Sequence, residues 1–155
     1  MEELNNYAEL IARGTPDLIE IKGVTYCGST GASNLTMKNV PFHEEVAEFS
    51  RQLAAMKQLE GKYELACEHQ HSCSFLIANK QKFFKKGKWY TWIDYEKFHE
   101  LVQSGKNFSS EDYMAETPEW AVVGNEAKGF DPEESRHSRK KKDENSGEEY
   151  ANQGC

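Results

Sequence analysis

Apolar residues recur at every third or fourth position in two stretches of the chain, a spacing that predicts amphipathic helices. The first stretch places four such residues on one helical face: Leu4, Tyr7, Ala8 and Ile11. Gly14 ends this pattern. The second stripe covers about residues 42–58, where Pro41 fits the first turn and Gly61 marks the end. We therefore predict an N-terminal helix and a second helix over 42–58.

Between these helices, residues 18–26 form an apolar, β-branched run that only Glu20 and Lys22 interrupt. A run that is apolar on both sides is typical of a buried strand in a parallel sheet. Glu20 and Lys22 lie two residues apart and therefore share a face. A lysine in such a strand is either paired with a carboxylate such as Glu20 or directed at an anionic ligand.

A loop of small polar residues, 27–34, follows this strand. In α/β folds, ligand sites lie at the loops that follow the C-terminal ends of strands. The backbone N–H and hydroxyl groups of residues 28–34 either bind a ligand or belong to a plain surface loop. The sequence thus indicates where a ligand would bind before it indicates which one.

Two more strands are predicted over 63–68 and 73–79, and a hairpin over 80–92 turns at Lys86 and Gly87. The hairpin interleaves aromatic residues with five lysines: Lys80, Lys82, Lys85, Lys86 and Lys88. Such a stretch can contact phosphates and stack on bases. The alternative is a solvated hairpin whose aromatic residues belong to the core.

A helix over 95–104, capped by Asp94, comes next, and Ser109 with Asp112 resembles the capping box of a short helix. Few apolar residues follow Gly129, so we expect residues 131–155 to be a disordered tail. The order of elements predicts the α/β class. The first strand has few neighbours with which to pair, which indicates the C-terminal portion of a larger fold.

Composition narrows the function. The 155 residues are 37% hydrophobic and 29% charged, so the core is modest. A formal net charge of −7 argues against general attraction to nucleic acid but leaves local basic patches, such as residues 136–142 (RHSRKKK). No apolar run approaches the length of a membrane span, and the acidic N-terminus is unlike a signal peptide. Four cysteines without a regular framework suggest a reducing compartment, the cytoplasm.

Residues 67–73 (CEHQHSC) place a cysteine or a histidine at every second position, which suggests a zinc site. In an extended strand the outer pair would lie about 20 Å apart, too far for one metal. A turn in the segment would bring them together. The alternative is a strand–turn–strand edge with polar side chains. Neither paired cysteine spacings nor a nucleotide-binding or hydrolase motif occurs, which removes most stand-alone enzymes.

Seven blocks, in order, resemble one enzyme family over about residues 14–142: DLIEIKGVTYCG, ASNLTMKNVPFHEEV, YELACEHQHS, FLIANKQKF, GKWYTWIDYEKFHELV, DYMAETPEWAVVG and KGFDPEESRHSRKK. They are similar to the C-terminal part of the eukaryotic tRNA 4-demethylwyosine synthases, radical S-adenosylmethionine (SAM) enzymes of wybutosine biosynthesis. The resemblance implies a flavodoxin-like domain that binds FMN, followed by a radical SAM partial TIM barrel with a [4Fe-4S] cluster. The implied reaction is that of a lyase, which condenses N1-methylguanosine of tRNA(Phe) with pyruvate.

This sequence lacks the flavodoxin-like domain and the three-cysteine cluster motif. We therefore expect the chain alone to bind no cofactor and to be inactive, with the missing domains and tRNA(Phe) as its partners and no membrane. The resemblance divides the chain into three parts: the last strand–helix units of the barrel (1–60), a wyosine-base-formation region (61–130) and the tail (131–155). The alternatives are a non-catalytic RNA-binding module and a small zinc module built on Cys67 and Cys73.

The resemblance also implies candidate site residues. The candidates for contact with substrate or SAM are Lys22, Ser33, Asn34, Glu68 and Ser72. The candidates for contact with tRNA are Lys80, Lys82, Lys85, Lys86, Lys88, Arg136, Arg139 and Lys140. No residue is assigned to catalysis or to a metal.

Overall fold

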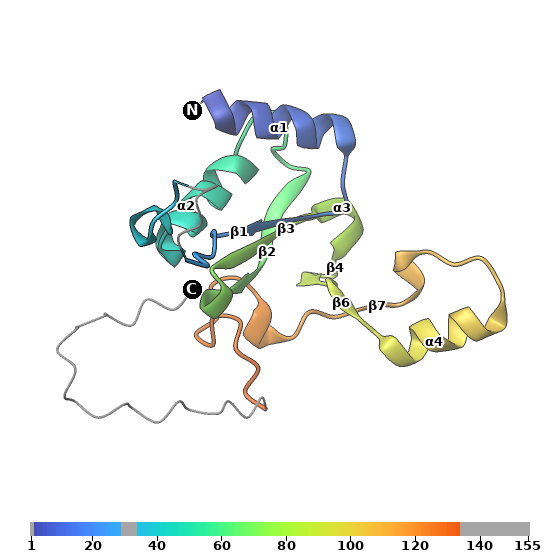
Figure 1. The fold of residues 1–155 in the computed structure, drawn as a ribbon. Coiled ribbons are helices and arrows are strands. Elements are labelled where there is room, and N and C mark those ends of the chain that lie inside the picture. Colours follow the sequence, from blue (N-terminus) through green and yellow to red (C-terminus); the bar gives the residue numbers. More distant parts are fainter. Residues whose placement is uncertain (1, 29–33, 134–155) are drawn as a thin grey trace, which may run out of the picture.

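A three-stranded antiparallel sheet forms the centre of the computed structural model, which describes residues 2–28 and 34–133 (Figure 1). The central strand is β3 (Ser74–Asn79), flanked by β1 (Leu18–Lys22) on one side and β2 (Tyr63–His69) on the other. The predicted α/β class is confirmed. The two strands predicted over 63–68 and 73–79 are also confirmed, and the turn between them is the short 3-10 helix η2 (Gln70–Ser72).

Two helices, α1 (Glu2–Gly14) and α2 (His43–Ala54), pack against one face of this sheet. Their apolar stripes meet strand residues in one core cluster: Leu4, Ala8, Ile11, Leu53, Leu59, Tyr63 and Ile77. Both predicted amphipathic helices are confirmed. The second ends about a turn early, because the backbone after Ala54 folds into successive turns that reach Gly61 at a φ of +74°.

The prediction for the first strand was wrong in two respects. β1 pairs with β3 in an antiparallel register, with Leu18 opposite Ala78 and Lys22 opposite Ser74. Its residues alternate between exposed and half-buried, because the helices cover only one face of the sheet and no described strand pairs with the outer edge of β1. The strand also stops at Lys22, well before residue 26. Glu20 and Lys22 do share a face, as predicted.

The C-terminal half consists of short elements beside the sheet (Figure 1). A single helical turn, α3 (Lys80–Phe83), leads into the predicted hairpin of β4 (Phe84–Lys85) and β5 (Lys88–Trp89). Strand β6 (Trp92–Ile93) then pairs with β7 (Met114–Ala115), and the helix α4 (Tyr95–Ser104) projects between them. Three further 3-10 turns are η1 (Met37–Asn39), η3 (Ser110–Asp112) and η4 (Glu119–Ala121).

The capping predictions for this half are mostly confirmed. The carboxylate of Asp94 accepts a hydrogen bond from the Lys97 N–H at 2.8 Å, and that of Asp112 accepts one from the Ser109 N–H at 2.8 Å. The short helix after Ser109 is only one 3-10 turn, because the chain pairs with β6 from Met114 onward. Most of the predicted tail, 134–155, lies outside the described residues. None of the helices described is long and apolar enough to cross a membrane.

Candidate functional site

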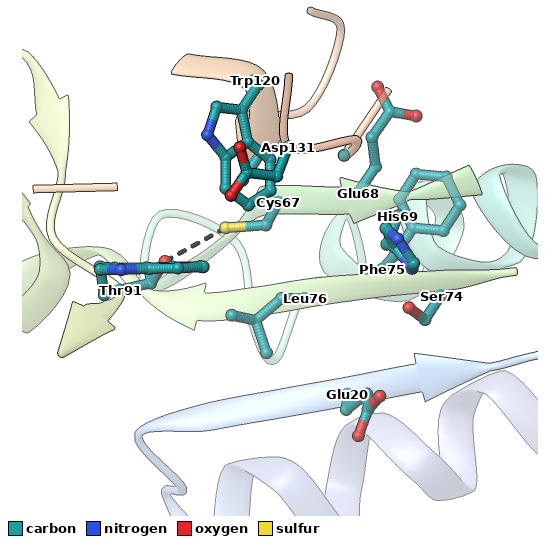
Figure 2. Close-up of a pocket in the computed structure, with 13 residues that line it drawn as sticks. Glu20, Cys67, Glu68, His69, Ser74, Phe75, Leu76, Thr91, Trp120 and Asp131 are labelled. Carbon is teal, nitrogen blue, oxygen red and sulfur yellow. Dashed lines mark hydrogen bonds between the residues drawn. The ribbon is translucent and has the colours of Figure 1, made fainter. Parts of the chain in front are cut away.

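The face of the sheet opposite α1 and α2 is hollowed into a cavity of about 400 Å³. We call it the tryptophan cavity, and its main walls are Glu20, Cys67, Leu76, Trp92, Trp120 and Asp131. The strand registers explain why three of these meet: Glu20 lies opposite Leu76, which lies opposite Cys67, and paired residues of an antiparallel sheet point to the same face. Figure 2 shows these three side chains on neighbouring strands, with Trp120 and Asp131 on the far side of Cys67.

Two tryptophans form one corner of the cavity. The rings of Trp92 and Trp120 meet edge to face, with centroids 5.5 Å apart and planes at 85°. Trp92 stays 43% exposed, so part of this residue remains accessible to a ligand. Trp120 is held through its backbone, because its carbonyl accepts a hydrogen bond from the Gly129 N–H at 2.8 Å. Gly129 itself lies so close to β2 that a Cβ there would sit 2.1 Å from the carbonyl oxygen of Glu68.

Cys67 provides a neutral part of the wall. Burial raises the pKa of its thiol, and the hydroxyl of Thr91, 3.1 Å from Sγ, offsets that rise only in part. Thr91 is in turn hydrogen-bonded to the buried Thr117, with the two hydroxyl oxygens 2.9 Å apart. A thiol with a raised pKa stays protonated near neutral pH and is a poor nucleophile. The geometry therefore suits a structural or hydrogen-bonding role for Cys67.

A buried pair of polar side chains lies behind the cavity. Nε2 of His43 is 3.2 Å from Oε2 of Glu68, and the two side chains are only 9% and 10% exposed. Oε1 of Glu68 accepts a hydrogen bond from the Gly124 N–H at 2.7 Å, so this carboxylate ties β2 to both α2 and the segment after η4. The ring of His43 stacks on Phe75, with centroids 4.7 Å apart, and its Nδ1 has no hydrogen-bond partner among the described residues.

A second hollow, of about 590 Å³, lies at the β1 edge of the sheet, where α1, α2 and β1 meet, and Glu20 lines it as well as the tryptophan cavity. We call it the α1–β1 groove. Its walls are mostly apolar side chains, among them Tyr7, Leu10 and Phe49, with Lys22 and Glu45 also lining it. Tyr7 and Leu10 are 52% and 61% exposed, so this side of the helix layer is not fully covered.

Comparison with known proteins shows which enzymes the chain is similar to. Residues 13–79 match the family described as wyosine base formation. An S-adenosyl-L-methionine-dependent tRNA 4-demethylwyosine synthase from Oryza sativa is 57% identical over 141 residues, which cover 91% of this chain and 21% of the relative. The synthases from Danio rerio and Homo sapiens are 57% and 51% identical over 148 residues, or 92% of this chain and 20% of each relative. The chain is thus similar to the C-terminal part of the tRNA 4-demethylwyosine synthases.

The sequence resemblance is thus confirmed, and the chain spans about a fifth of the length of the curated synthases it matches. The family match begins near the end of α1 and ends with β3, so it takes in the whole central sheet. The longer matches to the synthases cover nine tenths of the chain and therefore include both cavity tryptophans.

The substrate contacts implied by the synthase resemblance lie in separate places. Lys22 is exposed and lines the α1–β1 groove, whereas the exposed Asn34 follows the break in the described residues that contains Ser33. Glu68 lines the tryptophan cavity, although its carboxylate is engaged by His43 and Gly124. The structure therefore does not bring Lys22, Asn34 and Glu68 into one site, and Ser33 lies outside the described residues.

Ser72 lies next to the tryptophan cavity. Its hydroxyl oxygen is 2.6 Å from Nδ1 of His69 and 2.8 Å from the hydroxyl oxygen of Ser74, and both of these residues line the cavity. Sequence reasoning missed His43, Trp92 and Trp120 as site residues. Their partners lie tens of residues away along the chain, and no local spacing links them.

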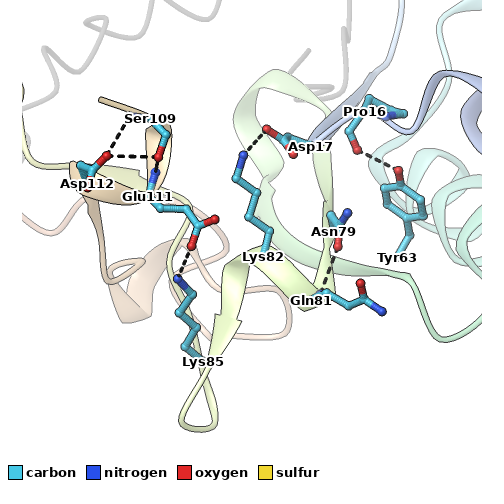
Figure 3. Close-up of polar contacts among 10 residues, drawn as sticks. All are labelled: Pro16, Asp17, Tyr63, Asn79, Gln81, Lys82, Lys85, Ser109, Glu111 and Asp112. Atoms are coloured by element: carbon cyan, nitrogen blue, oxygen red, sulfur yellow. Dashed lines mark hydrogen bonds and ion pairs between the residues drawn. The ribbon is translucent and has the colours of Figure 1, made fainter. Parts of the chain in front are cut away.

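Four of the five hairpin lysines form ion pairs: Lys80 with Glu64 at 2.6 Å, Lys82 with Asp17 at 2.6 Å, Lys85 with Glu111 at 3.0 Å and Lys88 with Glu116 at 2.5 Å. Figure 3 shows two of these pairs, which join the hairpin region to the start of β1 and to η3. Exposed pairs contribute about 0–1 kcal/mol each, so a phosphate can compete for such lysines. Lys86 is exposed at the turn, and Arg136, Arg139 and Lys140 lie outside the described residues.

The aromatic residues of the hairpin divide between the two alternatives. Phe83 and Trp89 are buried in a second core cluster with Ala66 and Ala78, so for these two the core alternative is confirmed. The zinc alternative receives no support from the geometry. Within the described ranges, no group of three or more histidine, cysteine, aspartate or glutamate side chains is placed to hold a metal.

Proposed function

We propose that this chain is the C-terminal region of a radical SAM enzyme that converts N1-methylguanosine of tRNA(Phe) and pyruvate into 4-demethylwyosine, a step of wybutosine biosynthesis. The observation that carries the proposal is identity of 51–57% with tRNA 4-demethylwyosine synthases over nine tenths of the chain. The wyosine-base-formation match over residues 13–79 supports it independently.

The residues of this chain do not fit the [4Fe-4S] cluster of the proposed reaction. Such clusters are held by cysteine thiolates, and the four cysteines of the sequence are widely spaced. Of those in the described part, Cys27 is exposed, Cys67 is partly buried beside Thr91, and Cys73 is fully buried. We infer that cluster, SAM and FMN are bound by the larger part of the enzyme, and that this chain alone does not catalyse the reaction.

The outer edge of β1 supports pairing with a further strand of the larger enzyme. This edge has free backbone N–H and C=O groups among the described residues, and such edges readily accept another strand. The α1–β1 groove beside it exposes apolar side chains that a larger protein would cover. We infer that β1 is one of the last strands of the partial barrel and that residues 1–60 complete it. Residues 61–130 form the wyosine-base-formation region.

In such a barrel the loop after β1 would face the SAM and substrate end. Lys22, Ser33 and Asn34 are the side chains that this placement brings nearest to the reactants. The hairpin lysines and the basic run over 136–142 would then contact the tRNA backbone outside the barrel, because phosphate contacts position a nucleic acid without reading its sequence.

Domain replacement tests the proposal. In host cells that lack their own synthase, the C-terminal fifth of the rice synthase is replaced by this chain, and tRNA(Phe) is digested and analysed by mass spectrometry. We expect 4-demethylwyosine from the chimera and none from this chain expressed alone. A chimera that is folded and carries its cluster but leaves N1-methylguanosine unchanged would contradict the proposal.

The runner-up is a non-catalytic RNA-binding module, favoured by the exposed lysine hairpin. It predicts that the isolated chain binds tRNA and that binding weakens steeply with salt. The two functions separate in the replacement assay, because a module that only binds RNA gives no modified base in the chimera.

A further inference from the structure

We propose that the tryptophan cavity is a nucleobase site, which holds a single guanine-type base turned out of the RNA stack. The inference rests on the proposed function, since it takes the RNA to be the tRNA whose guanosine is modified. It goes further by naming the place in this chain where that base is bound. Enzymes that alter a base inside a folded RNA expose it first and hold it between aromatic and apolar side chains.

The shape of the cavity fits one base. Its volume of about 400 Å³ lies within the usual range for small-molecule sites, roughly 300–1,000 Å³. Trp92 and Trp120 stand nearly perpendicular, so a base that stacks on Trp92 meets Trp120 at its edge. This corner leaves no parallel partner ring for a second base. Leu76 and Ala121 supply apolar wall around it.

The polar groups of the cavity select the part of a nucleotide that enters. Glu20 and Asp131 line it with carboxylates, and the side chain of Glu20, which also reaches the α1–β1 groove, forms no ion pair or hydrogen bond with a side chain of the described residues. Carboxylates repel phosphate and accept hydrogen bonds from N–H groups. Guanine carries an exocyclic amino group as donor, and N1-methylation leaves that group in place. The cavity therefore suits a base and disfavours a phosphate.

The lysines that precede Trp92 in the sequence fit a separation between a site for the base and a site for the phosphates. Lys88 lies on β5, four residues before Trp92, and the other hairpin lysines precede it. A phosphate backbone held by these lysines would lie along the chain next to the base site. The raised pKa of Cys67 keeps its thiol uncharged, so the wall beside Thr91 adds no further negative charge to the site.

Binding to a short RNA tests the site without the need for activity. The full chain is titrated with the anticodon stem-loop of tRNA(Phe) that carries N1-methylguanosine, and with the same loop carrying uridine at that position. We expect Trp92→Ala to weaken binding of the methylguanosine loop by roughly 10- to 100-fold, the usual effect of removing one stacking ring. Glu20→Gln should reduce the preference for methylguanosine over uridine. Tyr95→Ala is the matched control, because Tyr95 is an exposed aromatic residue that does not line the cavity.

The inference would be overturned if the wild-type chain did not bind the methylguanosine loop. Equal binding by the wild type and by a Trp92→Ala variant with unchanged circular dichroism would also overturn it. The same substitutions in the rice chimera separate the two proposals. If Trp92→Ala leaves the product yield of the chimera unchanged, the base site is refuted and the proposed function is retained. If the chain binds the loop in a Trp92-dependent manner but a chimera that carries its cluster gives no product, the base site is supported and the proposed function is refuted.

Discussion

The two faces of the central sheet are built in different ways. On one face, α1 and α2 bury a continuous apolar cluster in which Ile77 is fully buried. On the other face, the preceding residue, Leu76, borders the tryptophan cavity among polar and aromatic side chains. Because neighbours on a strand point to opposite faces, β3 serves both. The chain thus covers one face with helices and a continuous core, whereas the other face combines a smaller core cluster around Ala78 and Trp89 with an open cavity.

The open face is held by backbone hydrogen bonds rather than by packing alone. The Val123 N–H donates to the carbonyl of Ala66 at 3.1 Å, and the Thr117 N–H donates to that of Trp89 at 2.8 Å. These bonds fix the loops that carry the cavity walls against β2 and β5. The ligand site is therefore kept in shape both by the second core cluster, against which Cys67 packs, and by loops that are tied to the sheet.

The first and largest expected effect tests the contrast within β3 itself. Ile77→Ala would leave a void in the helix-covered core and should lower the free energy of unfolding by about 2–5 kcal/mol. Leu76→Ala is the matched control, because it removes a similar side chain from the open face and should cost much less. Urea titration of the full chain, followed by circular dichroism, gives both values. Equal losses for the two variants would refute the distinction between the faces.

The second effect concerns the loop that holds Trp120. Gly129→Ala would bring a Cβ to 2.1 Å from the carbonyl oxygen of Glu68 at a φ of +87°, so the segment must move. We expect a loss of about 1–3 kcal/mol from strain. Gly124→Ala is the control, since Gly124 has a similar φ of +84° but nothing within 4 Å of its Cβ position.

If Gly129 matters only through its positive φ, both glycine variants will lose the same stability. If its close approach to β2 positions Trp120, only Gly129→Ala will also change the tryptophan fluorescence and the binding of the methylguanosine loop. Thermal melts combined with fluorescence spectra of the two variants decide between these results.

The sequence predicted the local patterns of the chain best. The stripe from Leu4 to Ile11, the turn at Lys86 and Gly87 and the cap at Asp94 are local patterns, and each is found where it was expected. The prediction failed for β1, because an apolar strand composition cannot tell which strand pairs with it or which face a helix covers. In this chain its pairing partner is β3, which runs the opposite way.

The cavity shows the same limit more sharply. Trp92 and Trp120 meet only because Thr91, η4 and Gly129 contact β2, and no spacing in the sequence encodes that meeting. His43 was missed for the same reason, since Glu68 lies 25 residues away. Glu68 and Ser72 were predicted from the end of a strand, a local signal, and both lie at or next to the cavity.

The smallest expected effect tests the open face by pH. Burial raises the pKa of the Cys67 thiol, so the folded chain holds this proton more tightly than the unfolded chain does. The resulting stability is fully present below the unfolded pKa, about 8.5, and is lost as the pH rises through the higher folded pKa. The free energy of unfolding, measured by urea titration between pH 7 and pH 10, should therefore fall above that point. Cys67→Ala should flatten the fall, whereas the same change at the exposed Cys27 should leave it unaltered. If the free energy of unfolding depended on pH in the same way in Cys67→Ala and in the wild type, the prediction would be wrong. The thiol would then be exposed to water, and the wall beside Thr91 would not be a desolvated part of the open face.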